Sequence, residues 1–419
     1  MGVLSRATAI AIGTGLIVAG IASAASPVTV TMIAETRESS YKWQTEMKER
    51  FEATHPGITV DLVSVAGTGL IPKMQTMLAG GVPLDIGYMD PYLVVDWGKE
   101  GILEDLTPFL AKEQRQYRDW YPASLDLYRV RGGIFGLPQD LQISGIFYNK
   151  DQFSEAGLAF PKTSWTYDDL RRNAISLTRR EADGTFSRHG FKIPTSRNYV
   201  PLVWSYGGDF LDDWADPTRF TGKASETITA LEYLADLVTV GAVQDRVTHG
   251  RYGVATAFTQ RRIAMGLTNT VVMATGFQNI TAFDWDVVPL PEGPAGRVPY
   301  INGIGWFMFS SSKCKAEAYE LLRFLTSTEA LERRVQVTGL VPASARVFQT
   351  TWLSGQTMPA NRHLLLEDFD RARSPWPLHG DIFKIIDREV LSVVWGEKAA
   401  GSAVQLMEDG VSALLKATQ

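Results

Sequence analysis

The sequence predicts an α/β protein of two domains, with parallel, doubly wound sheets covered by helices. Three observations support this prediction. The chain has 419 residues, which is too long for one ordinary core. Strand-like and helix-like segments alternate along it, which is typical of parallel sheets. Hydrophobic residues make up 45% and charged residues 21% of the chain, enough apolar surface for a folded core beneath a mixed, soluble exterior.

The first two dozen residues predict export. Arg6 is the only charged residue before Pro27, and the stretch 7–20 is apolar and uncharged. Ala22-Ser23-Ala24 then offers the small residues that a signal peptidase accepts. The apolar run is short for a membrane span and ends in a processing site instead of a basic flank. We therefore expect a cleaved signal peptide over residues 1–24 and a mature protein in the periplasm.

Cysteine and charge exclude several classes of protein. Cys314 is the single cysteine, so the chain has no intramolecular disulfide and no cysteine-based zinc site. No cysteine follows the cleavage site, which argues against a lipid anchor. The net charge is −5 and no run is rich in Lys and Arg, so we expect no nucleic-acid or anionic-membrane partner. The five histidines are scattered without metal-ligand spacing, and we expect neither metal nor cofactor.

The first elements follow one another as strand, helix and strand. Residues 28–33 read as a strand, and Ser39-Ser40 begins a helix in which apolar residues recur every four positions until His55-Pro56-Gly57 ends it. A second strand over 58–65, a helix through Met74 and Leu78, and a third strand around 84–89 come next. Ligands of such sheets lie beyond the carboxyl ends of the strands, so the loops at 35–37, 67–69 and 90–91 are expected to share one edge.

The rest of the chain keeps the same alternation. The expected elements are a strand ending at 147–149, helices over 168–177 and 225–240, strands over 285–290 and 306–309, and a leucine-rich helix over 316–335. Residues 289–299 are rich in proline and glycine, and we interpret them as a surface hairpin.

Three segments resemble one known family. The strongest runs from Gly133 to Asp140, continues through Gly145 to Asp151 and ends at Trp165. The second comprises residues 81–86, Asp90, 100–103 and 106–108, and the third comprises 301–303, 312–313, 325–327 and 339–342. Together they resemble the extracellular solute-binding proteins of bacterial ABC importers, in particular the sugar-binding family 1 group that includes the maltose-binding protein.

The resemblance implies an architecture and a function. The fold would consist of two lobes, each a helix-flanked, mainly parallel sheet, with the ligand cleft at the hinge. The N-terminal lobe would comprise residues 25–142 and 285–342, and the C-terminal lobe 143–284 and 343–419. A monomer of this kind would capture a mono- or disaccharide by hinge closure and deliver it to permease subunits in the inner membrane. An acidic or sulfonated sugar is included in this expectation.

Candidate ligand contacts in the first lobe follow from strand ends and from the resemblance. Asp90 comes where a strand gives way to a loop, and its carboxylate could accept two sugar hydroxyls. The alternative is that Asp90 caps the helix that follows. Asp140 and Gln142 flank the first crossing between lobes. The resemblance aligns Gln142 with an acidic ligand residue of the family, and the amide departs from the maltose binder.

The remaining candidates are aromatic, polar and cationic. Trp204, with Gly207 allowing close approach, is a candidate platform for a sugar face, and Trp306, which follows Gly303, competes for that role. Either Trp could equally fill a core. Where the maltose binder has a stacking Trp after an Asn-Gly-Pro turn, this sequence has Asn269-Thr270-Val271-Val272, so that platform is missing. The other loop and cationic candidates are Thr36, Arg37, Thr68, Arg346 and His379, with Tyr41 a weaker one.

Three other functions remain alternatives. A glycoside hydrolase needs two carboxylates across one bond, and Asp90 with Asp140 is the pair on offer, but no spacing rule selects them. The chain has no Gly-x-Ser-x-Gly elbow, no His-Glu-x-x-His motif and no Walker loop, so we expect no enzyme. A binding protein that reports to a chemoreceptor, or one that binds glycerol phosphate or a polyol, would share the same hinge chemistry.

Overall fold

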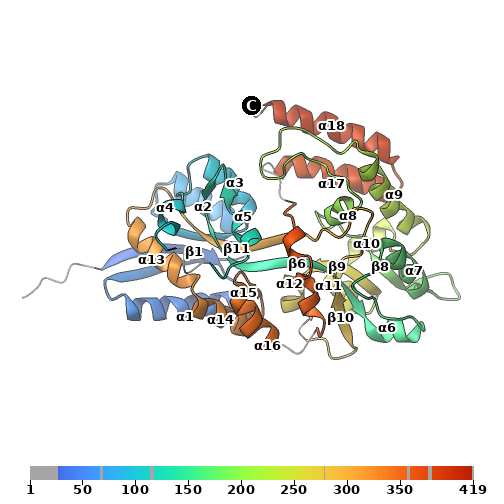
Figure 1. The fold of residues 1–419 in the computed structure, drawn as a ribbon, viewed down its shortest axis with the longest axis horizontal. Helices are drawn as coiled ribbons and strands as arrows, with labels where there is room; N and C mark the ends of the chain where they lie inside the picture. Colours follow the sequence, from blue (N-terminus) through green and yellow to red (C-terminus); the bar gives the residue numbers. More distant parts are fainter. Residues whose placement is uncertain are drawn as a thin grey trace, which may run out of the picture.

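The computed structural model describes residues 27–66, 69–113, 118–277, 279–355, 359–375 and 380–417. The signal peptide expected over residues 1–24 lies outside these ranges. Figure 1 shows two halves side by side, with β6 (Leu137–Asn149) and β11 (Ile301–Met308) running between them. No helix among the described residues has the length and apolar character that a membrane span needs.

The first half is built on β1 (Val28–Glu35), which pairs in parallel with β2 (Ile58–Val65) and β3 (Ile86–Met89). Helix α1 (Glu38–Thr54) joins β1 to β2 and buries Trp43, Met47 and Phe51, the residues whose spacing predicted it. The expected succession of strand, helix and strand is confirmed here, and the loop carrying Thr36 and Arg37 lies at the carboxyl end of β1.

Strand β6 connects the two halves. Its residues 137–143 pair with β11, and residues 140–141 also pair with β12 (Val341–Pro342). From Ser144 onward it pairs instead with β9 (Ile263–Asn269), and from Ile146 also with β10 (Trp285–Val288). Twelve of its 13 residues are buried, so this strand runs through the interior from one half to the other.

The second half contains β7 (Arg179–Arg180), β8 (Phe186–Lys192), β9 and β10. Strand β8 lies parallel to β9 and antiparallel to β7. A single hydrophobic core joins β8, β9 and β10 to α9 (Ser225–Thr239), α17 (Gly380–Val394) and α18 (Ala400–Ala417), whereas the two residues of β7 are exposed. The C-terminal segment therefore packs on the second half.

The whole sheet follows the order β2-β1-β3-β11-β6-β9-β8-β7. The α/β fold class is confirmed, but the sheet is mixed instead of mainly parallel. Strand β11 runs antiparallel to both β3 and β6, and β6 runs antiparallel to β9. The reason is that β6 and β11 cross between the halves in opposite directions, a property that local sequence patterns do not contain.

The lobe boundaries stay a prediction. Residues 285–288, which the sequence assigned to the first lobe, pair with residues 146–149, which it assigned to the second. This strand therefore lies beside the part of β6 that continues into the second half.

Two elements differ from expectation. The leucine-rich helix is divided into α13 (Lys315–Leu325) and α14 (Thr328–Thr338), because Ser327 begins a new helix and its hydroxyl accepts the backbone N–H of Ala330. The segment 289–299 is not simply a surface hairpin. Arg297 within it is buried, and its guanidinium bonds to the backbone oxygen of Leu290 and pairs with Asp368.

The remaining described elements are α2 (Leu70–Ala79), α3 (Pro91–Lys99), α4 (Thr107–Leu110), α5 (Pro122–Asp126), β4 (Arg129–Val130), β5 (Gly133–Ile134), α6 (Lys150–Glu155), α7 (Tyr167–Leu177), α8 (Val200–Ser205), α10 (Arg246–Arg251), α11 (Val254–Thr259), α12 (Thr270–Val272), η2 (Met273–Phe277), α15 (Ala345–Val347), η3 (Phe348–Trp352), α16 (Leu353–Gly355), η4 (Arg362–Leu366) and η5 (Phe369–Arg371).

Candidate ligand-binding site

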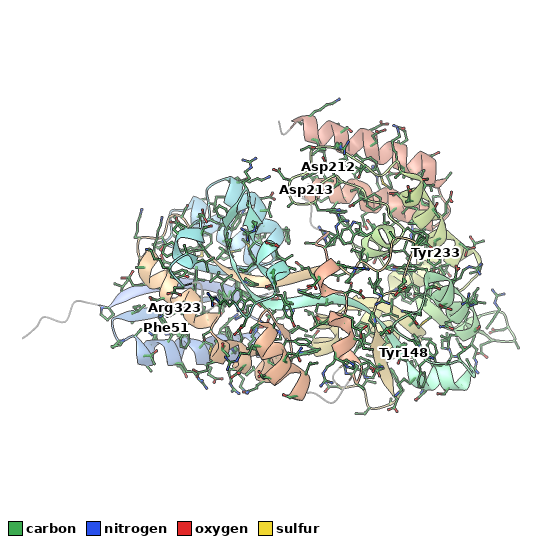
Figure 2. The ribbon with its side chains drawn as sticks, in the orientation of Figure 1. Phe51, Tyr148, Asp212, Asp213, Tyr233 and Arg323 are labelled. Carbon is green, nitrogen blue, oxygen red and sulfur yellow. The ribbon has the colours of Figure 1, made fainter. Side chains whose placement is uncertain are left out.

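Two cavities lie next to the strands that join the halves. The larger, of about 540 Å³, has residues of both halves in its wall: Tyr92 and Leu127 from the first, and Asp212, Trp214 and Arg373 from the second. Figure 2 shows Asp212 and Asp213 on the side of the second half that faces the first. This cavity is therefore a space that relative motion of the halves would enlarge or close.

The smaller cavity, of about 360 Å³, lies at the carboxyl ends of β1 and β3. Its wall includes Glu35, Arg37, Asp90 and Tyr92. Tyr92 lines both cavities, so the two spaces meet at the start of α3. This is the edge at which a parallel sheet is expected to bind ligands.

Asp90 is the best-placed of the predicted contacts. It precedes α3 at the capping position, but its side chain makes no capping hydrogen bond. Its Oδ1 instead accepts the amide Nδ2 of Asn302 on β11, at 3.1 Å. Burial raises the pKa of Asp90 to about 6, and the hydrogen bond from Asn302 opposes that rise. This carboxylate is poorly solvated and receives a hydrogen bond from one neutral donor. Its remaining lone pairs can therefore accept hydrogen bonds from ligand hydroxyls.

Asn302 is a residue that sequence reasoning missed as a candidate. It is 2% exposed, and it lies opposite Gln142 in the β6–β11 ladder. Its Oδ1 has no hydrogen-bond partner among the described residues. The signal available in the sequence was its place beside Gly303 in the third family-like segment.

Gln142, Asn269 and Tyr300 form a hydrogen-bonded group where β6, β9 and β11 meet. The Asn269 amide Nδ2 donates to Gln142 Oε1 at 3.2 Å and to the Tyr300 hydroxyl at 3.0 Å. The Asn269 oxygen accepts the backbone N–H groups of Val271 and Val272, which begin α12. Asn269 therefore orients Gln142 and Tyr300, and its side chain is already occupied.

Trp204 is buried and does not line either cavity. It is 3% exposed, and the guanidinium of Arg373 covers its ring at 4.4 Å from the centroid. Its indole N–H donates to Asp209 at 3.0 Å, and that of Trp214 donates to the same oxygen at 2.8 Å. Trp214 is among the residues that line the larger cavity, but it is itself only 5% exposed and packs in the core of the second half. The chain has 11 tryptophans in similar sequence contexts, so the sequence alone did not distinguish Trp214 from the others.

Trp306 and Gly303 are packing residues. Trp306 is fully buried, with its ring centroid 4.8 Å from that of Tyr88. A Cβ on Gly303 would lie 2.5 Å from the backbone oxygen of Asp140, so only glycine fits between β11 and β6 there. Gly207 has a φ of +92° and is exposed, beside Ala295 of the 289–299 segment.

Asp140 faces the interior of the first half instead of a cavity. Its carboxylate pairs with Arg334 of α14 at 2.8 Å, and it accepts the Tyr88 hydroxyl at 3.0 Å. The side chains of Asp140 and Arg334 are 2% and 1% exposed. The carboxylate of Asp140, which the sequence predicted to contact the ligand, is therefore occupied by a buried ion pair.

The loop and cationic candidates are dispersed. Thr36 is exposed, and its backbone N–H bonds to the oxygen of Val65. Arg37 lines the smaller cavity, where its Nε donates to Glu35 at 2.9 Å. Arg346 is exposed on α15 and lines neither cavity. Thr68 and His379 lie outside the described residues.

Arg197 lies in the second half between β8 and α8 and lines neither cavity. Its guanidinium carbon is 4.1 Å from the centroid of the Phe383 ring on α17. Across the described residues, no group of three or more His, Cys, Asp or Glu is arranged to hold a metal ion.

Comparison with known proteins identifies similar chains. The profile of the family of bacterial extracellular solute-binding proteins matches residues 34–332. A binding protein of Brucella abortus (strain 2308) is 28% identical over 337 residues, which cover 79% of this chain and 80% of that protein. The lactose-binding protein of Rhizobium radiobacter is 23% identical over 288 residues, which cover 66% of this chain and 65% of that protein.

Solved structures share the fold. An ABC substrate-binding protein of Listeria monocytogenes in complex with cycloalternan superposes with a TM-score of 0.81, at 23% identity, over 93% of this chain and 100% of that one. A cyclic α-maltosyl-1,6-maltose binding protein of Arthrobacter globiformis gives a TM-score of 0.79, at 20% identity, over 94% of this chain and 100% of that one.

Proposed function

Because the chain belongs to the family of bacterial extracellular solute-binding proteins, we propose that it binds a carbohydrate between its two halves and delivers it to an ABC permease. The observation that carries this proposal is a polar site assembled from three sources. Asp90 and Tyr92 of the first half line the cavities, Asn302 of the crossing strand β11 bonds to Asp90, and Asp212 and Arg373 come from the second half. The similarity to a lactose-binding protein supports a carbohydrate as ligand.

The chemistry of the cavity walls suits a sugar. Tyr92, which is half-buried, offers aromatic surface for the apolar C–H face of a sugar ring, and Asp90 offers a carboxylate acceptor. Groups on opposite walls can be satisfied together only when a ligand lies between them, so ligand favours the closed arrangement. Micromolar affinity corresponds to about −8 kcal/mol, which a few charge-assisted hydrogen bonds with aromatic stacking supply.

The wall charges favour a neutral ligand over the acidic or sulfonated sugar that the sequence also suggested. The larger cavity is lined by four aspartates, Asp126, Asp212, Asp213 and Asp370, and by two arginines, Arg129 and Arg373. Arg373 is paired with Asp209 at 2.6 Å, and Arg129 with Asp126 at 3.0 Å. An anion would therefore meet an excess of negative charge.

Catalysis is no part of this proposal. The two carboxylates that a hydrolase would need are separated in role, since Asp140 is locked to Arg334 in the interior while Asp90 lines a cavity. The remaining parts of the proposal are a signal peptide over residues 1–24, a monomer in the periplasm, and a hinge where β6 and β11 pass between the halves.

The proposal is tested by calorimetric titration of the mature protein, residues 25–419, with maltose, lactose, mannitol and glycerol 3-phosphate. We expect saturable binding of at least one neutral sugar, with a decrease in the radius of gyration by X-ray scattering as the halves close. Chromatography of the ligand after long incubation should return it unchanged. Absence of binding to every carbohydrate, or conversion of the ligand, contradicts the proposal.

A further inference from the structure

We propose that Asp216 of the second half forms an electrostatic latch with Lys99 and Arg131 of the first half, and that this latch strengthens ligand binding by holding the halves together. None of the three residues lines the larger cavity, but Ala215 and Arg129, close to them in the chain, do. The inference rests on the hinge of the proposed function, but it does not depend on which ligand is bound.

Asp216 is paired with two cations of the other half. Its Oδ1 lies 2.5 Å from the Nζ of Lys99 on α3, and its Oδ2 lies 4.0 Å from the Nε of Arg131 in the turn between β4 and β5. Trp214, two residues before Asp216, packs in the core of the second half, whereas Trp97 of α3 packs in the core of the first. Separation of the halves would therefore break both ion pairs.

The loop that presents Asp216 is fixed by its own hydrogen bonds. The carboxylate of Asp212 accepts three backbone N–H groups of the loop, and that of Asp213 accepts two more, including the N–H of Asp216. A bridge between Leu211 and Phe220 closes the base of the loop. Figure 2 shows Asp212 and Asp213 on the side of the second half that faces the first. Because the loop is already ordered, the ion pairs of Asp216 cost less entropy.

The two cations differ in how much they contribute. Lys99 is the last residue of α3, and its side chain is 13% exposed, so its charge has little water around it and gains more from a nearby carboxylate. Arg131 is 70% exposed, and its pair is longer and more strongly screened by solvent. Its φ of +47° and that of +88° at Gly132 belong to the two-residue turn that joins β4 to β5. Lys99 is therefore the main partner of the latch.

Contacts that exist only while the halves are together add to the affinity for a ligand. They lower the free energy of the closed arrangement relative to the open one, and a ligand held between the halves binds more tightly as a result. The latch acts through charge, so salt weakens it: the screening length falls from about 10 Å at 0.1 M to about 3 Å at 1 M salt. A neutral ligand has no charge of its own to be screened. The salt dependence of its binding therefore reports on the protein.

The test uses Asp216→Asn, the single charge reversals Lys99→Glu and Asp216→Lys, and the double reversal in the mature protein. The matched control is Glu408→Gln, which breaks an ion pair of 2.9 Å between Lys223 and Glu408 within the second half. X-ray scattering without ligand measures the separation of the halves. Calorimetric titration uses the sugar among maltose, lactose and mannitol that binds the unmodified protein most tightly, and melting temperatures report stability separately.

We expect Asp216→Asn to increase the radius of gyration without ligand and to weaken sugar binding about two- to fivefold, as for loss of a partly exposed ion pair. Salt raised to about 1 M should weaken binding by the unmodified protein and have little further effect on Asp216→Asn. Each single reversal should weaken binding more, and the double reversal should restore most of it, because the pair is formed again with its charges exchanged. Glu408→Gln should change neither the radius of gyration nor the affinity.

Two results overturn the inference. One is that Asp216→Asn keeps the radius of gyration and the salt-dependent affinity of the unmodified protein, even if its melting temperature falls, because the role of Asp216 is then structural. The other is that the double reversal binds no better than the single ones. Failure of the proposed function is distinguishable from both: if no carbohydrate binds but Asp216→Asn still separates the halves, the proposed ligand is wrong and the latch stands.

Discussion

Asp90 and Asp140 show how position in the fold separates two similar carboxylates. Asp90 lies at a cavity wall, and its carboxylate accepts a hydrogen bond from the neutral amide of Asn302. Asp140 lies on the buried strand β6, and its partners are the guanidinium of Arg334 and the hydroxyl of Tyr88. The first carboxylate keeps capacity for an external partner, and the second is used entirely inside the protein.

The raised pKa of Asp90 predicts a pH dependence of ligand binding. Its pKa is about 6 in the protein without ligand, and hydroxyl donors from a ligand favour the ionised form and lower that value. Binding therefore releases a proton near this pH, and affinity falls as the pH is lowered through about 6. Titrations between pH 5 and 8 should show this fall, and it should be absent in Asp90→Asn. An affinity independent of pH would exclude Asp90 as a contact.

The pair Asp140–Arg334 predicts a strong effect on stability. Asp140→Asn leaves a guanidinium that is 1% exposed without its counter-charge, which costs about 3–5 kcal/mol. Urea unfolding should show this loss. The double variant Asp140→Leu/Arg334→Met removes both charges and should recover most of it, because paired replacement by apolar residues avoids the buried unpaired ion. Equal losses in the single and double variants would contradict this account.

Single residues also mark the limit of sequence reasoning about the site. Asp90 and Arg37 were predicted from strand ends, and both line a cavity. Tyr92 and Asn302 were missed because their places beside Asp90 depend on which surfaces the fold brings face to face. Trp204 and Trp306 were plausible platforms by residue type, but burial decides between platform and core, and burial at one tryptophan among 11 is a tertiary property.

At the scale of elements, local patterns were sufficient for most helices and strands of the first half. The strand over 58–65 has the expected bounds, and the helix with Trp43 and Phe51 begins one residue before Ser39. The expected helix over 316–335 is two helices. Although the leucine periodicity continues across Ser327, its hydroxyl caps the start of α14. A capping hydrogen bond depends on one residue, whereas the hydrophobic period is averaged over several turns. The period alone therefore does not show where one helix ends and the next begins.

The division between α13 and α14 predicts the effect of Ser327→Ala. The hydroxyl of Ser327 accepts the backbone N–H of Ala330 at 3.3 Å, and loss of such a cap costs about 1 kcal/mol. Thermal or urea unfolding should show this decrease. Ser402→Ala, an exposed substitution inside α18, serves as the control and should be neutral or slightly stabilising because alanine is the better helix former. An unchanged stability in Ser327→Ala would show that packing alone separates the two helices.

At the scale of the whole molecule, the α/β class and the alternation of elements could be predicted, but the sheet topology could not. The chain enters β6 in one half and leaves it in the other, and β11 returns between β3 and β6. The residues of β6 do not determine on their own that its neighbour will be β11, about 160 residues later in the sequence. The family resemblance predicted that the chain crosses between two lobes. The strand register places a crossing at residues 143–144 of β6, where the neighbouring strand changes from β11 to β9.

The place of β11 has a consequence for how the protein is made. The first half cannot complete its sheet until residues 301–308 have been synthesised, because β11 fills the position between β3 and β6. About three-quarters of the chain therefore leaves the ribosome while the earliest strands still lack a central neighbour, and contacts so distant in sequence form slowly. A nascent chain that folds late remains unfolded for longer, and the unfolded state is the one that the proposed export through a secretion channel requires.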